Sequence, residues 1–202
     1  MYIDKNDIMS HLQKGELVLE FGCGYEKRHD NAIGVDARDF PCVDIVGDVF
    51  EVLADLPDCS VKAIYAYHFV EHVNDLSSLL KEIVRVCRID GIIELSAPHF
   101  SNPFFYSDPT HKNTFGLYTF AYFFENELFR RSIPDYSRIS CAKLVSVDLV
   151  FKSYRPNYFR HALKKTLSCI VNLSPWTQEL YEEMGSSVFS CYEVIYLVKK
   201  MA

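Results

Sequence analysis

Short apolar runs separated by turns divide the first half of the chain. Runs suited to buried strands occupy residues 17–21, 32–36, 43–46, 62–67 and 92–97, and two more occupy residues 143–154 and 192–199. Between residues 75 and 88 the apolar side chains recur at helical spacing, and Asn74 or Asp75 can cap that helix. Strands that alternate with short helices or turns are typical of an open α/β sheet with mostly parallel strands. The pattern therefore predicts an α/β fold with a seven-stranded sheet.

The other expected helices are short. Residues 5–14, 49–55 and 156–183 have helical character, and the last segment is broken at Ser174 and Pro175. After Pro98 the composition shifts to aromatic residues, proline and asparagine, which predicts a long loop followed by a helix within residues 100–124. No stretch resembles a linker between domains, so we expect a single domain over residues 1–202.

The connection between the first two strands is unusually short. In LVLEFGCGYEKRHDNAIGVD, residues 17–36, only residues 25–31 separate a glycine turn from the second strand. A parallel crossover usually needs about a dozen residues or more. The dinucleotide fingerprint G-x-G-x-x-G fails because Lys27 occupies its third glycine position, and no P-loop pattern is present. With so little helix to present an N-terminus, we expect no pyrophosphate site here.

Three acids stand at the carboxyl ends of expected strands, where open α/β sheets bind their ligands. Glu20 would repel a phosphate but suits the sulfonium and ammonium groups of S-adenosyl-L-methionine. Asp36 can accept hydrogen bonds from ribose hydroxyls, and Asp48 can accept one from an adenine amino group.

Five motifs carry a family resemblance: LEFGCG (19–24), IGVD (33–36), VGDV (46–49), YHFVEHV (67–73) and LLKEIVRVCRIDGIIELSAP (79–98). Together they resemble the class I S-adenosylmethionine-dependent methyltransferases, in the type 11-like small-molecule group with a short first crossover. The resemblance implies a Rossmann-like sheet whose last strand is antiparallel, S-adenosyl-L-methionine as cofactor and S-adenosyl-L-homocysteine as product. The cofactor-binding residues that it implies are Glu20, Gly22, Cys23, Gly24, Asp36, Ala37, Asp48, Val49, Tyr67 and His68.

Two positions depart from the family pattern. Glu26 replaces the usual third glycine of the loop, and Ile89-Asp90-Gly91-Ile92 replaces the usual Lys-Pro-Gly-Gly turn. Neither change removes a cofactor-contacting group. We expect the cofactor-binding part near residues 15–100, with substrate or lid elements near residues 99–135 and 155–190.

Histidines are the candidate catalytic residues, because methyl transfer to a hydroxyl is helped by a general base that works near neutral pH. The candidates are His72, His99 and His111, which follow the fourth and fifth strands, and Asp108 can orient His111. Alternatively, His72 and Glu71 only cap or brace the following helix, and His111 lies on an Asp-Pro surface turn. These residues and His68 could converge on a divalent ion, but His68 ends a strand and does not share a helix face with His72. We therefore expect no metal site.

The composition limits the partners. A net charge of -6 argues against nucleic acid, which needs a basic face. The seven cysteines are scattered and form no C-x-x-C, so we expect reduced thiols rather than disulfides or a structural zinc site. The N-terminal segment lacks the apolar core of a signal peptide and no apolar run is long enough to span a membrane, so we expect a cytoplasmic protein.

Two patterns after Pro98 bear on the identity of the acceptor. Residues 155–173 set Arg160, Lys164 and Lys165 against an apolar stripe, which suits transient contact with a membrane surface or a phosphorylated substrate, although such helices more often pack on their own domain. The aromatic residues of 100–124 can build a lid or belong to the core. The sequence Asn-Pro-Phe-Phe at 102–105 is similar to the N-P-P-Y motif of nucleobase methyltransferases, but it follows the wrong strand and lacks the second proline.

We therefore expect an S-adenosylmethionine-dependent methyltransferase that acts on a small-molecule or glycan acceptor, at a hydroxyl of a sugar or sugar-phosphate. The resemblance also suggests a place in polysaccharide biosynthesis. The alternatives are a non-catalytic scaffold or regulatory partner of another enzyme, which need not retain Gly22, Gly24, Asp36 and Asp48, and a nucleic-acid methyltransferase, which the acidic charge disfavours.

Overall fold

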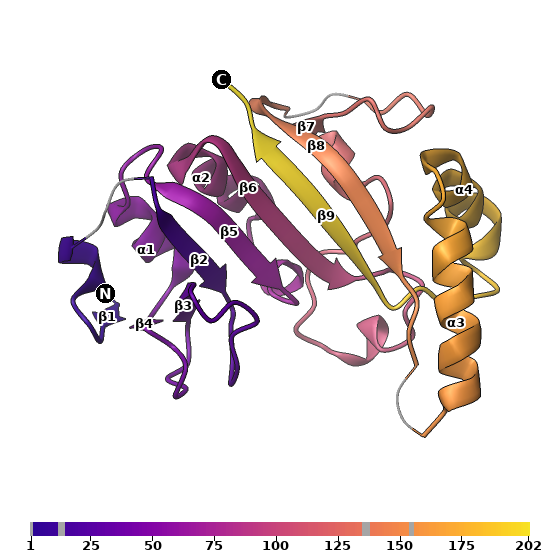
Figure 1. Ribbon diagram of the computed structural model, residues 1–202, viewed down its shortest axis with the longest axis horizontal. Coiled ribbons are helices and arrows are strands. Elements are labelled where there is room, and N and C mark those ends of the chain that lie inside the picture. Colours follow the sequence, from indigo (N-terminus) through magenta and orange to yellow (C-terminus); the bar gives the residue numbers. More distant parts are fainter. Residues whose placement is uncertain (1, 12–14, 135–137, 154–155) are drawn as a thin grey trace.

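The computed structural model describes residues 2–11, 15–134, 138–153 and 156–202 (Figure 1). Its strands form one sheet in the order β1-β4-β3-β2-β5-β6-β9-β8-β7. The run from β4 to β6 is parallel, and β9 is antiparallel to both of its neighbours, β6 and β8. The expected mostly parallel sheet with an antiparallel last strand is confirmed.

All seven predicted strands are present, and two short edge strands were missed. The predicted strands are β2 (Leu17–Phe21), β3 (Ile33–Asp36), β4 (Ile45–Val46), β5 (Val61–Tyr67), β6 (Cys87–Pro98), β8 (Ile139–Val150) and β9 (Glu193–Lys200). The missed strands, β1 (Ile3–Asp4) and β7 (Phe124–Glu125), have two residues each, too few to show a periodic pattern. Tyr154, at the end of the predicted sixth strand, lies outside the described residues.

Two predicted helices form where their caps are strong. The Asp48 side chain accepts from the Phe50 amide at the start of α1 (Val49–Asp55), and Asp75 caps α2 (Leu76–Val86) through the Ser78 amide. The C-terminal helical segment is divided as expected into α3 (Tyr158–Val171) and α4 (Pro175–Leu180), which continues into η5 (Tyr181–Gly185). Ser174 caps α4 and so causes the break.

Two other helix predictions were too long. Residues 5–14 contain the short 3-10 helix η1 (Ile8–His11), and residues 12–14 lie outside the description. Within residues 100–124 there are two single 3-10 turns, η3 (Phe105–Ser107) and η4 (Thr119–Tyr122), and η2 (Val70–His72) follows β5. Proline and glycine interrupt the 100–124 segment, so its aromatic residues are buried by a folded loop rather than by one helix face.

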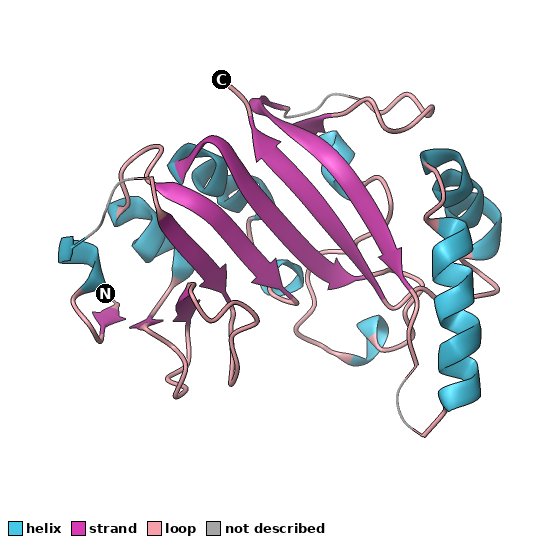
Figure 2. Ribbon diagram, viewed as in Figure 1, coloured by secondary structure: helices cyan, strands magenta, loops and turns pink. Residues whose placement is uncertain are grey.

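The two faces of the sheet are covered differently. Helices α1 and α2 lie behind the sheet in Figure 2, over a face built from Leu19 of β2, Ile64 of β5 and Leu95 of β6, all nearly inaccessible to solvent. The opposite face carries Tyr65 and Glu94 at the alternate positions, and both are half-buried. Among the described residues, no helix crosses this part of that face in Figure 2, because the short first crossover forms turns instead.

Candidate active site

The glycine turn after β2 is a close approach between two segments. Gly22 and Gly24 have φ angles of 65° and 60°, in the left-handed region that favours glycine. The Gly22 amide donates to the Val35 carbonyl at 2.8 Å, which ties the turn to β3. A Cβ atom at Gly22 would lie 2.9 Å from the Phe69 ring, so a side chain there must displace the segment that follows β5.

Asp36 is held in place by the turn and keeps acceptor capacity. Its Oδ2 atom accepts from the Gly24 amide and its Oδ1 atom accepts from the Arg38 amide, both at 2.9 Å. Each carboxylate oxygen has two lone pairs, so each can accept one more hydrogen bond. The half-buried carboxylate is therefore fixed and still able to bind a pair of vicinal hydroxyls.

Glu20 folds the short crossover. Its carboxylate is buried, and its two oxygens accept from the backbone amides of Arg28 and His29 at 3.0–3.1 Å. The ring of His29 stacks on the ring of Tyr65 in β5, with the ring centroids 3.7 Å apart, so the crossover packs against the sheet. A buried carboxylate thus supplies the hydrogen bonds that a helix would otherwise satisfy internally. The motif around Glu20 predicts a cofactor contact, whereas this structural role depends on the backbone of the crossover and has no signal in the sequence.

Cys23 and Tyr67 are both engaged with protein groups. Burial, followed by the nearby Cys42 thiol, raises the pKa of Cys23 to about 12, so this thiol stays protonated. The Tyr67 hydroxyl donates to Glu94 at 2.7 Å and lies 2.8 Å from His29 Nε2. Burial and the Glu94 hydrogen bond raise the pKa of Tyr67 above its usual range. Their expected cofactor contacts remain predictions.

A cleft of about 180 Å³ opens beside the β3 and β4 ends. The residues that line it are Ala37, Gly47, Asp48, Val49, Phe50, Phe69, His72, Val73 and Asn74. Asp48 is exposed and uses one oxygen, Oδ1, to cap α1 at 2.7 Å from the Phe50 amide. The structure therefore brings four predicted site residues, Ala37, Asp48, Val49 and His72, around one cleft.

His68 lies at the centre of a charged network. Its φ angle of 54° is unusual for a residue with a side chain, and such backbone strain is frequent at functional sites. The Nε2 atom lies 2.6 Å from Glu193 Oε2, and Nδ1 lies 3.5 Å from Glu71 Oε1. Burial alone would lower the pKa of His68, but the hydrogen bond with Glu193 and the nearby Glu71 carboxylate outweigh burial and raise the pKa to about 9.

Glu193 links His68 to a lysine. Burial would raise the pKa of Glu193, but the hydrogen bond from His68 and the charge of Lys152 lower it to about 2. Lys152 Nζ lies 3.1 Å from the other Glu193 oxygen, Oε1. Because Glu193 opens β9 and is 125 residues from His68, no local motif could have identified it.

The three candidate bases are placed very differently. His99 is fully buried, and both ring nitrogens are occupied: Nδ1 lies 2.8 Å from Ser101 Oγ and Nε2 lies 3.0 Å from Glu182. This arrangement disfavours His99 as a base, because neither nitrogen is free to reach an acceptor. His72 and His111 instead lie together, with ring centroids 5.0 Å apart.

A basic pocket lies beside the His68 network. Its volume is about 190 Å³, and Lys152 belongs both to it and to the Glu193 ion pair. Lys164 lines this pocket, and burial together with the charge of Arg160 lowers the pKa of this lysine. The residues that line the pocket are Asn102, Pro103, Phe104, Lys152, Ser153, Asn157, Arg160, Lys164, Ser190, Cys191 and Tyr192.

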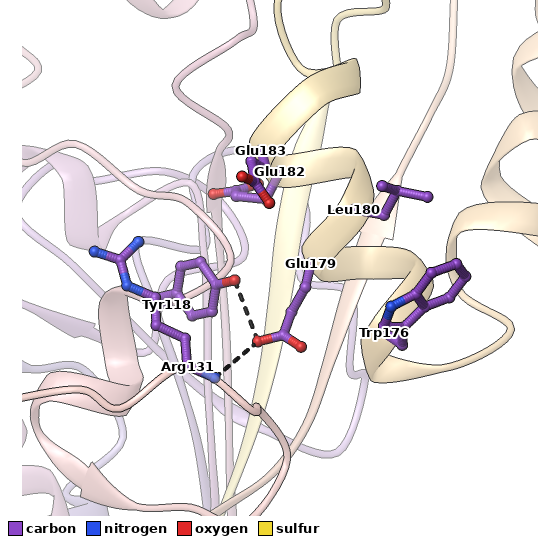
Figure 3. A pocket seen from close by; sticks show the side chains of 7 residues that line it. All are labelled: Tyr118, Arg131, Trp176, Glu179, Leu180, Glu182 and Glu183. Atoms are coloured by element: carbon purple, nitrogen blue, oxygen red, sulfur yellow. Dashed lines mark hydrogen bonds between the residues drawn. The ribbon is translucent and has the colours of Figure 1, made fainter.

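A larger cavity of about 570 Å³ lies elsewhere (Figure 3). Its lining residues are Tyr118, Arg131, Trp176, Glu179, Leu180, Glu182 and Glu183. Glu179 accepts from the Tyr118 hydroxyl and the Arg131 amide at 3.2–3.3 Å, which joins α4 to the loop before β8. None of the predicted site residues lines this acidic cavity, so size alone does not locate the site.

The fold and its carboxyl edge define a class I S-adenosylmethionine-dependent methyltransferase. Residues 19–95 match the family model described as a methyltransferase domain, Methyltransf_11, so this part of the chain is similar to that family. Its cofactor is S-adenosyl-L-methionine and its product S-adenosyl-L-homocysteine. The fixed Asp36 carboxylate and the adjoining cleft fit a nucleoside. An enzyme is thus favoured over the non-catalytic alternative.

Solved structures share the fold at low sequence identity. A S-adenosylmethionine-dependent methyltransferase from Archaeoglobus fulgidus is 19% identical with a TM-score of 0.57, over 95% of this chain and 89% of that chain. A Haloferax volcanii methyltransferase in complex with the activator Trm112 is 12% identical with a TM-score of 0.53, over 96% and 87% of the chains. Phosphoethanolamine N-methyltransferase 2 of Haemonchus contortus, bound to S-adenosyl-L-methionine, is 10% identical with a TM-score of 0.51, over 94% and 50%.

No curated protein matches the sequence. Within the described ranges, no helix has both the length and the apolar composition needed to cross a membrane.

Proposed function

We propose that this enzyme transfers the methyl group of S-adenosyl-L-methionine to a hydroxyl of a small anionic acceptor, of the sugar-phosphate class. The observation that carries the acceptor class is the basic pocket defined above, with Lys152, Arg160 and Lys164 in its lining. A placement in polysaccharide biosynthesis remains a prediction from the family resemblance.

The cofactor is proposed to bind along the ends of β2 to β5. Gly22 and Gly24 would face the methionine part, and Asp36 would accept from the two ribose hydroxyls. Asp48 and the Val49 amide would meet the adenine, since both line the cleft beside β4. This arrangement leaves the methyl group near His68, between the cofactor cleft and the basic pocket.

The acceptor argument rests on charge and on the mixture of side chains. Three cationic residues in one pocket favour a phosphate or carboxylate over a neutral ligand. The side chains of Asn157 and Ser153 also line the pocket and can bind hydroxyl groups. The Lys152–Glu193 ion pair joins this pocket to His68, so a bound acceptor would lie next to the methyl donor.

Two histidines at the same edge are available to assist loss of the hydroxyl proton. His72 and His111 each use Nδ1 in a contact with an oxygen atom of the protein, which leaves Nε2 available to interact with the acceptor hydroxyl. His99 lacks a free nitrogen, so the proposal assigns it a structural role.

The acceptor pocket can be tested with a matched pair of lysines. Lys164 lines the pocket, whereas Lys165 is exposed and does not. We expect Lys164→Gln to raise KM for phosphorylated sugars about tenfold, the effect of losing one charged hydrogen bond, with unchanged affinity for S-adenosyl-L-homocysteine. Lys165→Gln should match the wild type. Methyl transfer is followed with radiolabelled cofactor over phosphorylated and neutral sugars.

Two results would contradict the proposal. Equal turnover of neutral and phosphorylated sugars would remove the charge argument. Equal behaviour of Lys164→Gln and Lys165→Gln would show that the acceptor binds outside the pocket.

A further inference from the structure

A cluster of one carboxylate and two imidazoles lies at the edge between the cofactor cleft and the loop after β6. Glu71, His72 and His111 each place a potential ligand atom within 4.8 Å of the others. Glu71 is 1% exposed, and neither of its carboxylate oxygens has a hydrogen-bond partner among the described residues. Burying a carboxylate in this way is costly unless a cation completes its environment. His68 Nδ1 approaches Oε1 to 3.5 Å and compensates that oxygen in part, whereas Oε2 has no hydrogen-bond partner among the described residues.

The hydrogen bonds around His72 fix its tautomer. The Thr110 hydroxyl donates its single proton to Asp108 Oδ1 at 2.6 Å. The same hydroxyl lies 2.9 Å from His72 Nδ1, so it must accept the proton of that nitrogen. His72 Nε2 therefore carries the lone pair when the ring is neutral.

His111 is fixed in the same way by a backbone group. Its Nδ1 atom lies 2.8 Å from the Phe105 carbonyl oxygen, which can only accept, so Nδ1 carries the proton. Nε2 again holds the lone pair. A histidine whose Nδ1–H is bound by an oxygen while Nε2 stays free has the arrangement typical of metal-ligating imidazoles.

The two segments of the cluster are joined before any ligand arrives. The backbone amides of Lys112 and Asn113 donate to the Glu71 carbonyl at 2.7 Å and 3.2 Å. The Asn113 side chain also donates to the carbonyls of Val70 and Val73. These bonds hold the loop that carries His111 against η2, so the three groups are preorganised.

We propose that Glu71, His72 and His111 bind one divalent transition-metal ion of the Zn²⁺ or Co²⁺ type. Two imidazole nitrogens and one carboxylate oxygen suit such ions, whereas Mg²⁺ and Ca²⁺ prefer oxygen ligands. Three protein ligands leave a coordination position open to an exogenous oxygen. Asp108, whose Oδ2 lies 3.8 Å from His111 Nε2, adds negative charge beside the site.

With Nε2 of His72 and His111 bound to the ion, the ion replaces direct proton abstraction by these histidines as the means of activating the acceptor, and this role rests on the proposed function. A hydroxyl bound to the ion has a lowered pKa and releases its proton to solvent. The oxygen then forms the bond to the methyl carbon as the carbon–sulfur bond breaks, and neutral S-adenosyl-L-homocysteine leaves. The binding of the ion itself does not depend on this chemistry.

The test is a calorimetric titration of the chelator-treated, full-length protein with Zn²⁺ and with Mg²⁺, under reducing conditions. We expect one Zn²⁺ per chain, and Glu71→Gln, His72→Gln and His111→Gln should each weaken binding by about tenfold or more. His161→Gln is the matched control, since this histidine is exposed on α3 and should leave binding unchanged.

Exposed thiols require a second readout, because Cys59, Cys141 and Cys169 can bind zinc adventitiously. Co²⁺ distinguishes the two cases: nitrogen and oxygen ligation gives visible bands without the near-ultraviolet charge-transfer band of a thiolate. Should His72→Gln fold poorly by circular dichroism, His111→Gln on its loop decides the question.

The outcomes separate the two proposals. Zn²⁺ binding that is unchanged in His111→Gln, or that shows thiolate bands with Co²⁺, overturns the site. Site binding of Zn²⁺ without any stimulation of methyl transfer keeps the site and overturns its role in acceptor activation. Binding of S-adenosyl-L-homocysteine without Zn²⁺ binding overturns this inference alone and leaves the proposed function standing.

Discussion

At the carboxyl ends of the strands, the proposed cofactor site around Asp36 and Asp48 (the cofactor side) and the proposed acceptor site around His68 and Lys152 (the acceptor side) are built in different ways. On the cofactor side each acid is fixed by its own neighbourhood, since Asp36 and Asp48 both accept from an amide two residues further along the chain. On the acceptor side the contacts join distant segments: His68 and Glu193 are 125 residues apart, and Glu193 and Lys152 are 41 apart. A locally built site can be found in sequence, whereas a site assembled by the sheet becomes visible only in the structure.

The largest expected effect removes the key group of the cofactor side. Asp36→Ala deletes a carboxylate proposed to accept two ribose hydroxyls, and charged hydrogen bonds contribute about 1.5–3 kcal/mol each. We expect affinity for S-adenosyl-L-homocysteine to fall by about a hundredfold or more, measured by calorimetry. Asp39→Ala, an exposed acid outside the cleft, should bind normally. Unchanged binding by Asp36→Ala would move the nucleoside away from this carboxylate.

The next effect falls on the crossover. Glu20→Gln replaces one carboxylate oxygen by an NH2 group; the remaining oxygen can take the Oε2 position, which accepts from both amides, but the NH2 group then lies against the Arg28 amide. We expect a loss of about 2–3 kcal/mol in the free energy of unfolding, measured with urea, because the new NH2 group faces the Arg28 amide as a second donor and the remaining hydrogen bonds lose the carboxylate charge. The exposed Glu26→Gln should change stability by less than about 0.5 kcal/mol. Equal stabilities would mean that the crossover does not depend on this carboxylate.

A smaller, pH-dependent effect distinguishes the acceptor side. The pKa of Glu193 is about 2 in the folded protein against an ordinary 4.5, so the folded state binds this proton less tightly than the unfolded state. Its contribution is complete above pH 4.5 and is lost as the pH falls from 4.5 through 2. We expect Glu193→Gln to be less stable at neutral pH and to lose less stability over that acid range, as measured by thermal unfolding. A parallel acid slope in both proteins would contradict the pairing with His68 and Lys152.

The smallest expected effect concerns the support of the proposed metal ligands. Thr110→Val removes the hydroxyl that holds the Nδ1 proton of His72, and loss of such an outer contact weakens metal binding about tenfold. Thr166→Val on α3, where the hydroxyl bonds to the Ala162 carbonyl, should leave Zn²⁺ affinity unchanged. If both variants bind Zn²⁺ like the wild type, the tautomer of His72 does not control the site.

The sequence predicted the parts of the molecule whose cause is local. The strands near Leu19 and Ile64 follow from apolar runs, and the starts of α1 and α2 follow from the caps Asp48 and Asp75. Residues Ala37, Asp48 and Val49 were placed in the site by motif alone, and the structure gathers them at one cleft.

The sequence could not predict which histidines are free. His99 and His111 both follow β6 and look alike in sequence, but the distant Glu182 occupies one and leaves the other open. From the sequence, Glu71 was considered only as a brace for the following helix, because its lack of a hydrogen-bond partner is a property of packing rather than of spacing. Glu193, likewise, is adjacent to His68 only because β9 pairs with β6.

The anchoring of the crossover by Glu20 limits how this loop can change in evolution. Surface connections between strands normally tolerate insertions well. Here, added residues near positions 25–31 would move the Arg28 and His29 amides away from Glu20. The buried Glu20 carboxylate would then lose its hydrogen-bond donors. A descendant of this protein could regain a full helix in the first crossover only by replacing Glu20 at the same time. We therefore expect the short crossover and Glu20 to be retained or lost together.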